Sequence, residues 1–442
     1  MKKQKAATPV VSVDFSKKIG KIKPLHGAGQ GPILGWSDFS MFHYLKEAGV
    51  PFARLHDTGG AFGKNLYVDI PNVFRDFDAN PYDPANYDFA FTDKLMEALV
   101  ENGVEPYYRL GVTIENKCDI KAYRIFPPKD NLQWARICEG IIRHYTEGWG
   151  NGYKMNISHW EIWNEPENDP DPMVNHMWRG TFEQYLELYN TASKYLKGLF
   201  PHLKIGGYAS CGFYAMTRDK KTVNPRVWVR YEFLNTAFLQ FVEYVKANKC
   251  PLDFFSFHCY DDVRGGVKHI AFVRKTLDDA GFKDTELSLN EWLPSTGETG
   301  SVQQAAYIAA MLAGMQNSGV IDDSEIYDAR CGMGRYSPLF HPVTYQPRPA
   351  YYTLFAFNEL YKRKNAVATS GAPEDVWVTA AKGPRDGAVY VANITGKEVP
   401  LSFDFGGKKV VSCKIVDETH TYEEVALPAV LPKDSFLLII VK

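Results

Sequence analysis

The sequence predicts an α/β fold, a (β/α)8 barrel of the TIM type followed by a small C-terminal antiparallel β-sandwich. Between residues 22 and 362, eight short apolar runs alternate with longer stretches of helical periodicity, as in repeated βα units around a parallel sheet. From residue 363 onward, short strand patterns follow one another directly, separated by Gly, Pro and Asp turns. A doubly wound open sheet is less favoured because the chain has no G-x-G-x-x-G loop.

Three parts are therefore expected. Residues 1–21 hold an N-terminal strand that joins the β domain, residues 22–362 form the barrel, and residues 363–442 form the β-sandwich. The candidate barrel strands are residues 23–27, 52–57, 105–111, 158–164, 204–210, 252–260, 286–291 and 324–328.

Several helix ends carry their own signals. Gly49 and Gly103 stand where a left-handed residue ends a helix. Thr181 with Gln184, and Ser301 with Gln304, have the spacing of capping boxes that open a helix. The last barrel helix is expected over residues 350–361.

Composition excludes some classes of protein and leaves the compartment open. Fifty Lys and Arg against 52 Asp and Glu give a net charge of -2, so no basic field predicts a nucleic-acid or membrane partner. Seven scattered cysteines form no C-x-x-C pair. No stretch is long and apolar enough to span a bilayer. The compartment is not decided by the sequence: the protein is either cytoplasmic, or periplasmic or secreted with a leader absent from this chain, and its oligomeric state stays open.

The residues with the clearest chemistry stand where two predicted barrel strands end. Glu165 follows Asn164 at the end of the fourth strand, and Glu291 follows Asn290 at the end of the seventh. In a TIM barrel the active site lies at this C-terminal edge, and strands four and seven lie on opposing sides of the ring. Two facing carboxylates are what glycosidic bond cleavage requires, one as proton donor and one as nucleophile or base. Ordinary strand-end glutamates paired with arginines are the competing interpretation.

With these motifs the chain resembles a retaining glycoside hydrolase of clan A, and family 39 most closely. The resemblance implies that Glu165, in its Asn-Glu-Pro motif, is the general acid/base and that Glu291 is the nucleophile. It implies that Asn164 binds the 2-hydroxyl of the sugar. For Asn164 and Glu165 both to reach the sugar, the strand must end irregularly before Pro166, because neighbouring residues of a regular strand face opposite sides.

Other strand ends match the same family. Arg54 and His56 share one face of the second strand, so that Arg54 is expected to orient the nucleophile and lower its pKa, and His56 to bind sugar hydroxyls. On the sixth strand, Tyr260 is expected to donate a hydrogen bond to Glu291, and His258 to contact the sugar or tune Glu165. Trp292 and Tyr327 are expected among the pocket walls or sugar platforms, with core packing as the alternative.

Substrate identity is less constrained by the sequence. A β-xyloside is the commonest answer in the family, with α-L-iduronide, α-L-arabinoside, β-galactoside and β-glucoside as alternatives, in exo or endo action on oligosaccharides or polysaccharides. The segment after strand eight, residues 326–335, departs from the tryptophan and acidic run of the family's β-xylosidases, which weakens the xylose assignment.

Two other classes of function compete with this one. A metal-dependent barrel hydrolase would need converging ligands, and the sequence has neither H-x-H nor H-E-x-x-H spacing, so no metal and no cofactor are expected. A non-catalytic carbohydrate-binding homologue would be expected to have lost one of the two glutamates, and both are present.

Overall fold

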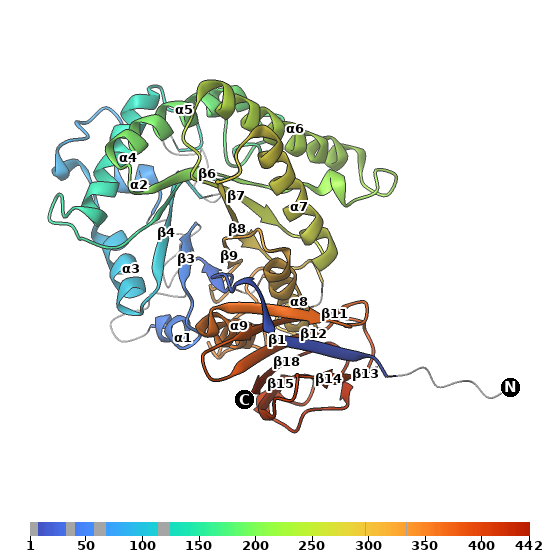
Figure 1. Ribbon diagram of the computed structural model, residues 1–442. Helices are drawn as coiled ribbons and strands as arrows, with labels where there is room; N and C mark the ends of the chain where they lie inside the picture. Colours follow the sequence, from blue (N-terminus) through green and yellow to red (C-terminus); the bar gives the residue numbers. More distant parts are fainter. Residues whose placement is uncertain (1–7, 32–39, 57–67, 114–123, 297, 333) are drawn as a thin grey trace.

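A closed barrel of eight parallel strands forms the larger part of the protein (Figure 1). The computed structural model describes residues 8–31, 40–56, 68–113, 124–296, 298–332 and 334–442. Around the barrel the strands follow chain order, and the ring closes between the last strand and the first, which pair as parallel neighbours. They are β2 (Gly27–Gly29), β3 (Phe52–Leu55), β4 (Glu105–Leu110), β5 (His159–Ile162), β6 (Lys204–Ser210), β7 (Phe254–Cys259), β8 (Glu286–Trp292) and β9 (Asp323–Ile326).

Helices surround this ring and bury their apolar faces against it. Those of the described residues are α1 (Phe42–Glu47), α2 (Ile70–Val73), α3 (Ala90–Glu101), α4 (Asn131–Thr146), α5 (Phe182–Leu199), α6 (Pro225–Asn248), α7 (Val263–Ala280), α8 (Val302–Ser318) and α9 (Tyr351–Arg363), with short 3-10 turns η1 (Pro84–Asn86) and η2 (Tyr214–Met216). None of them combines the length and apolarity that a membrane crossing requires.

The C-terminal part forms a second sheet, in the order β14-β1-β10-β11-β12-β18-β15-β16. Its strands are β1 (Val10–Lys21), β10 (Asn365–Ser370), β11 (Val376–Lys382), β12 (Gly387–Asn393), β14 (Ser402–Asp404), β15 (Val410–Val416), β16 (Thr421–Glu424) and β18 (Ser435–Val441). A separate ribbon pairs β13 (Val399–Pro400) with β17 (Val430–Leu431). In Figure 1 the blue β1 lies among the orange and red strands, and it pairs antiparallel with β10 and parallel with β14.

The barrel and the C-terminal sheet share a hydrophobic interface. One core cluster runs from the barrel through α8 and α9 to side chains of the sheet such as Tyr390 and Phe436. The hydroxyl of Tyr390 also donates a hydrogen bond to the carbonyl of Thr353 on α9 at 3.2 Å. The opposite face of the sheet has its own core, which includes Val13 and Leu437.

The predicted fold class is confirmed, and the differences lie at element ends. The first barrel strand is Gly27–Gly29 instead of residues 23–27, where a proline at position 24 interrupts strand pairing. Thr181 and Gln184 form the predicted capping box. Ser301 accepts from the backbone of Gln304 as predicted, but the Gln304 side chain accepts from the Gly300 amide, so the box is not reciprocal.

Candidate active site

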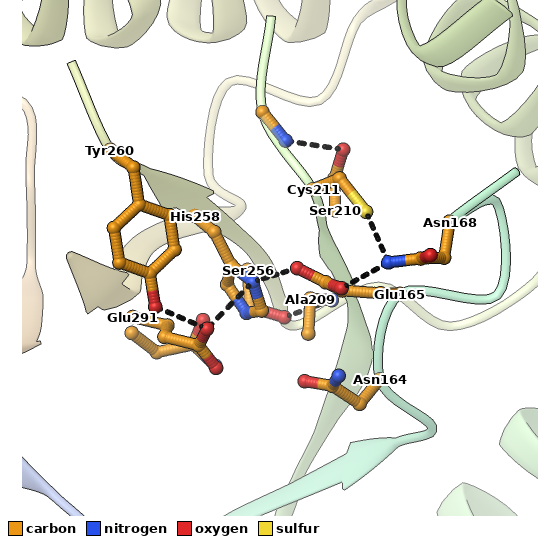
Figure 2. A network of polar contacts seen from close by, with 12 residues as sticks. Asn164, Glu165, Asn168, Ala209, Ser210, Cys211, Ser256, His258, Tyr260 and Glu291 are labelled. Atoms are coloured by element: carbon orange, nitrogen blue, oxygen red, sulfur yellow. Dashed lines mark hydrogen bonds and ion pairs between the residues drawn. The ribbon is translucent and has the colours of Figure 1, made fainter. Parts of the chain in front are cut away.

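Glu165 and Glu291 meet at the C-terminal edge of the barrel, with the ring of His258 between them (Figure 2). The Nδ1 atom of His258 lies 2.7 Å from Oε1 of Glu165 and 3.5 Å from Oε1 of Glu291. One oxygen of each carboxylate and a ring nitrogen of His258 all lie within 4.8 Å of one another. Two residues 126 positions apart in the chain therefore face a common point.

The backbone after β5 explains how Asn164 and Glu165 both reach this point. β5 ends at Ile162, and Trp163 and Glu165 then adopt left-handed conformations with φ of 76° and 46°. Two barrel hydrogen bonds hold this turn, from the Trp163 amide to the Leu110 carbonyl at 2.7 Å and from the Glu165 amide to the Ala209 carbonyl at 3.1 Å. Left-handed backbone is costly for side chains of this size and is concentrated at functional sites.

Glu291 is held by donors on both of its oxygens. Tyr260 donates its hydroxyl to Oε1 at 2.6 Å, and Arg54 donates Nη1 to Oε2 at 3.1 Å. Burial raises the pKa of Glu291 above the usual glutamate value, with the like charge of Glu165 adding to it, while His258, Arg54 and Tyr260 oppose the rise. These donors fix the orientation that an attacking carboxylate needs.

Arg54 connects the nucleophile position to a second buried carboxylate. Its Nε donates to Oε2 of Glu161 at 2.9 Å, and its Nη2 donates to Oδ1 of Asn164 at 2.6 Å. The other oxygen of Glu161 accepts from Nδ2 of Asn290 at 2.5 Å. Arg54 is 1% exposed and Glu161 is fully buried, so their charges compensate each other away from water.

Glu165 shares a proton with His258. Burial alone would raise the pKa of Glu165, but the hydrogen bond and charge of His258 outweigh it and lower this pKa to about 2, with Arg230 and Asn168 contributing. The pKa of His258 is raised despite its burial, because both carboxylates favour the imidazolium. Both shifts favour an ionised Glu165 beside a protonated Nδ1 of His258, 2.7 Å from Oε1 of Glu165. Transfer over this hydrogen bond gives a protonated Glu165.

A cavity of about 480 Å³ opens above these groups. Its walls include His56, Asn164, Glu165, Met177, Cys211, Tyr214, Arg218, Arg230, Tyr231, Tyr260, Glu291, Tyr327, Arg330, Arg335 and Tyr336. His56 is buried, and its burial, with the charges of Arg109 and Arg54, lowers its pKa well below the ordinary histidine value, so its ring is neutral. The ring of Tyr327 lies edge-on to that of Tyr260, with centroids 6.1 Å apart.

Trp292 is placed differently from the expectation. It is fully buried and belongs to the hydrophobic core, and it is not among the described residues that line the cavity. The end of β8 is irregular: its register shifts against both β7 and β9, Asn290 and Glu291 both reach the network of Arg54 and Glu161, and Trp292 packs into the core. The other predicted residues, from Arg54 to Tyr327, lie in or directly beneath the cavity wall.

Sequence reasoning missed three supporting residues. Glu161 could have been found, since it is a charged residue between the apolar Trp160 and Ile162 of a predicted barrel strand, and alternate residues of such a strand point inward. Asn168, whose Nδ2 donates to Oε2 of Glu165 at 2.7 Å, lies in a loop with no periodic signal. Arg230 contacts that loop from α6, 62 residues later, and only the folded chain shows this contact.

Among the residues that the structure describes, two groups of side chains could in principle hold a metal ion. The first is Glu165, His258 and Glu291, where the Arg54 guanidinium already compensates the charge of Glu291 and reduces the gain from a second cation. The other is His159, Glu286 and Asp323 at the opposite end of the barrel. There the Lys204 ammonium lies 2.7 Å from Glu286, so this carboxylate, like Glu291, already has a positively charged side chain as its partner.

The chain has sequence relatives among characterised proteins. The chain is 20% identical over 339 residues to a β-xylosidase of Geobacillus stearothermophilus, an alignment that covers 67% of this chain and 61% of the relative. It thus spans about three fifths of that relative's length. A second β-xylosidase, of Caldicellulosiruptor saccharolyticus, is 25% identical over 214 residues, covering 45% of this chain and 40% of the relative.

Among solved structures, a glucosidase from Croceicoccus marinus superposes with a TM-score of 0.73 at 21% identity, covering 99% of both chains. A GH39 β-xylosidase from Caulobacter crescentus has a TM-score of 0.64 at 17% identity, covering 98% of this chain and 99% of the other. These likenesses concern the fold. The sequence profile of the Glycosyl hydrolases family 39 matches residues 63–323, which is more than half of the chain and includes both glutamates. The chain therefore belongs to glycosyl hydrolase family 39.

Proposed function

We propose that this protein is a retaining glycoside hydrolase that acts by double displacement on oligosaccharides or polysaccharides, with β-xylosides as the first candidate substrate. The observation that carries the proposal is the pair Glu165 and Glu291, whose nearest oxygens lie within 4.8 Å across the cavity. Retaining enzymes hold their carboxyl groups roughly 5–5.5 Å apart, whereas inverting enzymes need roughly 6.5–9.5 Å to fit a water molecule.

In the first step Glu291 attacks the anomeric carbon. The bond to the leaving oxygen breaks, and that oxygen takes the proton of Glu165, which His258 supplies over the 2.7 Å hydrogen bond. The product of this step is a glycosyl ester of Glu291. In the second step Glu165 accepts a proton from water, the water oxygen bonds to the anomeric carbon, and the ester bond breaks.

The neighbouring residues have roles that follow from their contacts. Arg54 holds Glu291 in place through a hydrogen bond. It also donates to Oδ1 of Asn164, so the NH2 group of Asn164 remains to donate to a sugar hydroxyl. Tyr260 withdraws charge from Glu291 through its hydrogen bond and makes the ester easier to break in the second step. His56 and Tyr327 border the cavity as neutral partners for hydroxyl groups.

A panel of nitrophenyl glycosides tests the proposal: β-xyloside, α-L-arabinoside, β-galactoside, β-glucoside and α-L-iduronide. We expect turnover of one member and its loss in Glu291→Ala, with Glu101→Ala, an exposed glutamate of α3, as the control that retains activity. Retention is read from the anomer first formed, by NMR. Inversion of configuration would contradict the double displacement, and silence on this panel and on xylo- and gluco-oligosaccharides would contradict the enzyme assignment.

A further inference from the structure

Of the described residues that line the cavity, four are arginines: Arg218, Arg230, Arg330 and Arg335. Two of them are compensated by aspartates. Arg218 lies 2.8 Å from Asp261, and Arg330 lies 2.9 Å from Asp328. Arg335 is exposed at the rim and lies over the ring of Tyr336 at 4.5 Å. Arg230 is the one that combines partial burial with closeness to the reacting groups.

The hydrogen bonds of Arg230 go to neutral groups, while its charge also acts on the nearby Glu165. Its Nε donates to the backbone carbonyl of Asn168, and its Nη2 lies 3.6 Å from Sγ of Cys211. Across the parts of the chain that the structure describes, no carboxylate lies within ion-pair distance of this guanidinium. A guanidinium has five N–H donors in a planar fork, and removing it from water is costly without an anion. Part of the fork is therefore available to a ligand in the cavity that it lines.

The position of Arg230 identifies the part of the substrate that it meets. Asn168, whose carbonyl it contacts, is the residue whose side chain donates to Oε2 of Glu165. Arg230 therefore lies on the acid/base side of the cavity, whereas Glu291 lies on the other side of His258. The group that receives the proton of Glu165 is the leaving group. Tyr214 and Tyr231, with ring centroids 5.2 Å apart, border the same side and offer flat apolar surface.

We propose that Arg230 binds an oxyanion, a carboxylate or a sulfate, on the leaving-group part of the substrate, so that the protein cleaves glycosides whose aglycone or leaving sugar is acidic. This inference rests on the proposed glycosidase function and specifies its substrate class. Planar guanidinium forks bind carboxylates and comparable oxyanions through paired hydrogen bonds.

Binding of such an anion would also aid the acid. The charge of Arg230 contributes to the lowered pKa of Glu165 in the free site. An anion on the guanidinium offsets this charge and adds a negative one nearby, and both effects favour the protonated form of Glu165. The acidic leaving group thus promotes the proton transfer that releases it.

Three aryl glycosides with the same sugar test the inference. They carry 3-carboxyphenyl, 3-sulfophenyl and 3-carbamoylphenyl leaving groups on β-xylose, or on the sugar that the nitrophenyl panel selects. We expect kcat/KM for at least one anionic member to exceed that for the neutral amide, after correction for leaving-group acidity. Arg230→Gln should lower the anionic value by about 10- to 100-fold more than it lowers the amide value, the effect of one charge-assisted contact.

Controls separate this role from a structural one. Arg226→Gln removes an exposed arginine one turn earlier on α6 and should leave all three values unchanged. If Arg230→Gln unfolds at a lower temperature, Arg230→Lys keeps the charge and is compared in the same way. An equal loss on the charged and neutral substrates would show that Arg230 only supports the loop of Asn168, and would overturn the inference.

Binding without turnover keeps the inference separate from the proposed function. Calorimetric titration of the intact glycosides into Glu291→Gln, with and without Arg230→Gln, measures the preference for the anion directly. Tighter binding of the carboxylate or the sulfate, lost with Arg230, supports the subsite even if the wild type hydrolyses nothing. Anions that bind no tighter than the amide overturn it, even if the neutral glycoside is a good substrate. Comparison of the two anions identifies which one the fork prefers.

Discussion

Arg54→Lys should show whether Arg54 acts through its positive charge alone or through the arrangement of its hydrogen bonds. The guanidinium of Arg54 donates to Glu161, Glu291 and Asn164 at 2.6–3.1 Å, all from one planar group. A lysine keeps the positive charge but has a compact ammonium that cannot reach three acceptors on different strands at once. Because Glu161 is the most buried of the three and holds two of the contacts, we expect the ammonium to remain with Glu161.

The magnitude follows from the contacts that are lost. Glu291 and Asn164 each lose a charge-assisted hydrogen bond, which contributes about 1.5–3 kcal/mol. Asn164 then loses its fixed orientation toward the sugar, and Glu291 loses its donor on Oε2. Together these changes predict a fall in kcat/KM of about 10² to 10⁴-fold. Since the buried Glu161 keeps a cation, the free energy of unfolding should fall by less than the roughly 3–5 kcal/mol of a broken buried pair.

The assay is kcat/KM on the best nitrophenyl glycoside, together with urea unfolding at the same pH. Arg109→Lys is the matched control, a buried arginine on the adjacent strand β4 that pairs with Asp69 at 2.7 Å. It should lose comparable stability without a comparable loss of activity. A less than tenfold loss in Arg54→Lys, or an equal loss in both variants, would refute the view that Arg54 positions the nucleophile and Asn164.

Three further predictions concern protons and backbone. The pH profile of kcat/KM should be bell-shaped. Activity is lost as pH falls through the pKa of Glu291, which is raised above its ordinary 4.5, and is lost again as pH rises through the pKa of His258, which is raised above its ordinary 6.5. A profile that is flat from pH 4 to 9 would contradict this prediction. Glu165→Gln should lower kcat/KM for a glycoside with a poor phenolic leaving group by about 10² to 10⁴-fold. It should change kcat/KM for a dinitrophenyl glycoside little, because that leaving group needs no protonation. Equal losses on both substrates would count against the acid role of Glu165. Gly49→Ala should lower the free energy of unfolding, measured by urea titration, by more than about 1 kcal/mol. The reason is that φ of Gly49 is 63° and an added Cβ would lie 2.1 Å from Nδ2 of Asn358. Unchanged stability would contradict the reasoning.

Strand parity accounts for most of what could be predicted of the site. Side chains on alternate positions of a barrel strand point inward, so Arg54 with His56, and His258 with Tyr260, could be placed on common faces before any coordinates. The same rule could not place Trp292, because β8 ends irregularly and its neighbours Asn290 and Glu291 both reach the network of Arg54 and Glu161. The aromatic character of Trp292 suited both a platform and a core, and the core position is the one it takes.

Contacts between loops could not be predicted in this way. Residues 326–335 are recognisable as unlike the family's β-xylosidases, but the sequence alone does not show that Arg330 and Arg335 line the cavity. Arg230 lies on a helix whose exposed and buried faces follow its packing on the barrel, while its side chain contacts the loop after β5. Such contacts depend on how far each loop folds over the barrel mouth, for which neither periodicity nor parity carries a signal.

Regular strand geometry ends at the Asn164-Glu165 motif that identifies the site, because both residues must reach the same cavity. Asn164 and Glu165 are adjacent, so a regular strand would send one of them into the barrel wall. The left-handed φ values at Trp163 and Glu165 turn both toward the cavity, and hydrogen bonds to β4 and β6 maintain this conformation. The indole of Trp163, bonded through Nε1 to the Met177 carbonyl at 2.9 Å, anchors the turn in the core. The tryptophan before the Asn-Glu pair thus stabilises the strained backbone that lets two neighbouring residues face one cavity.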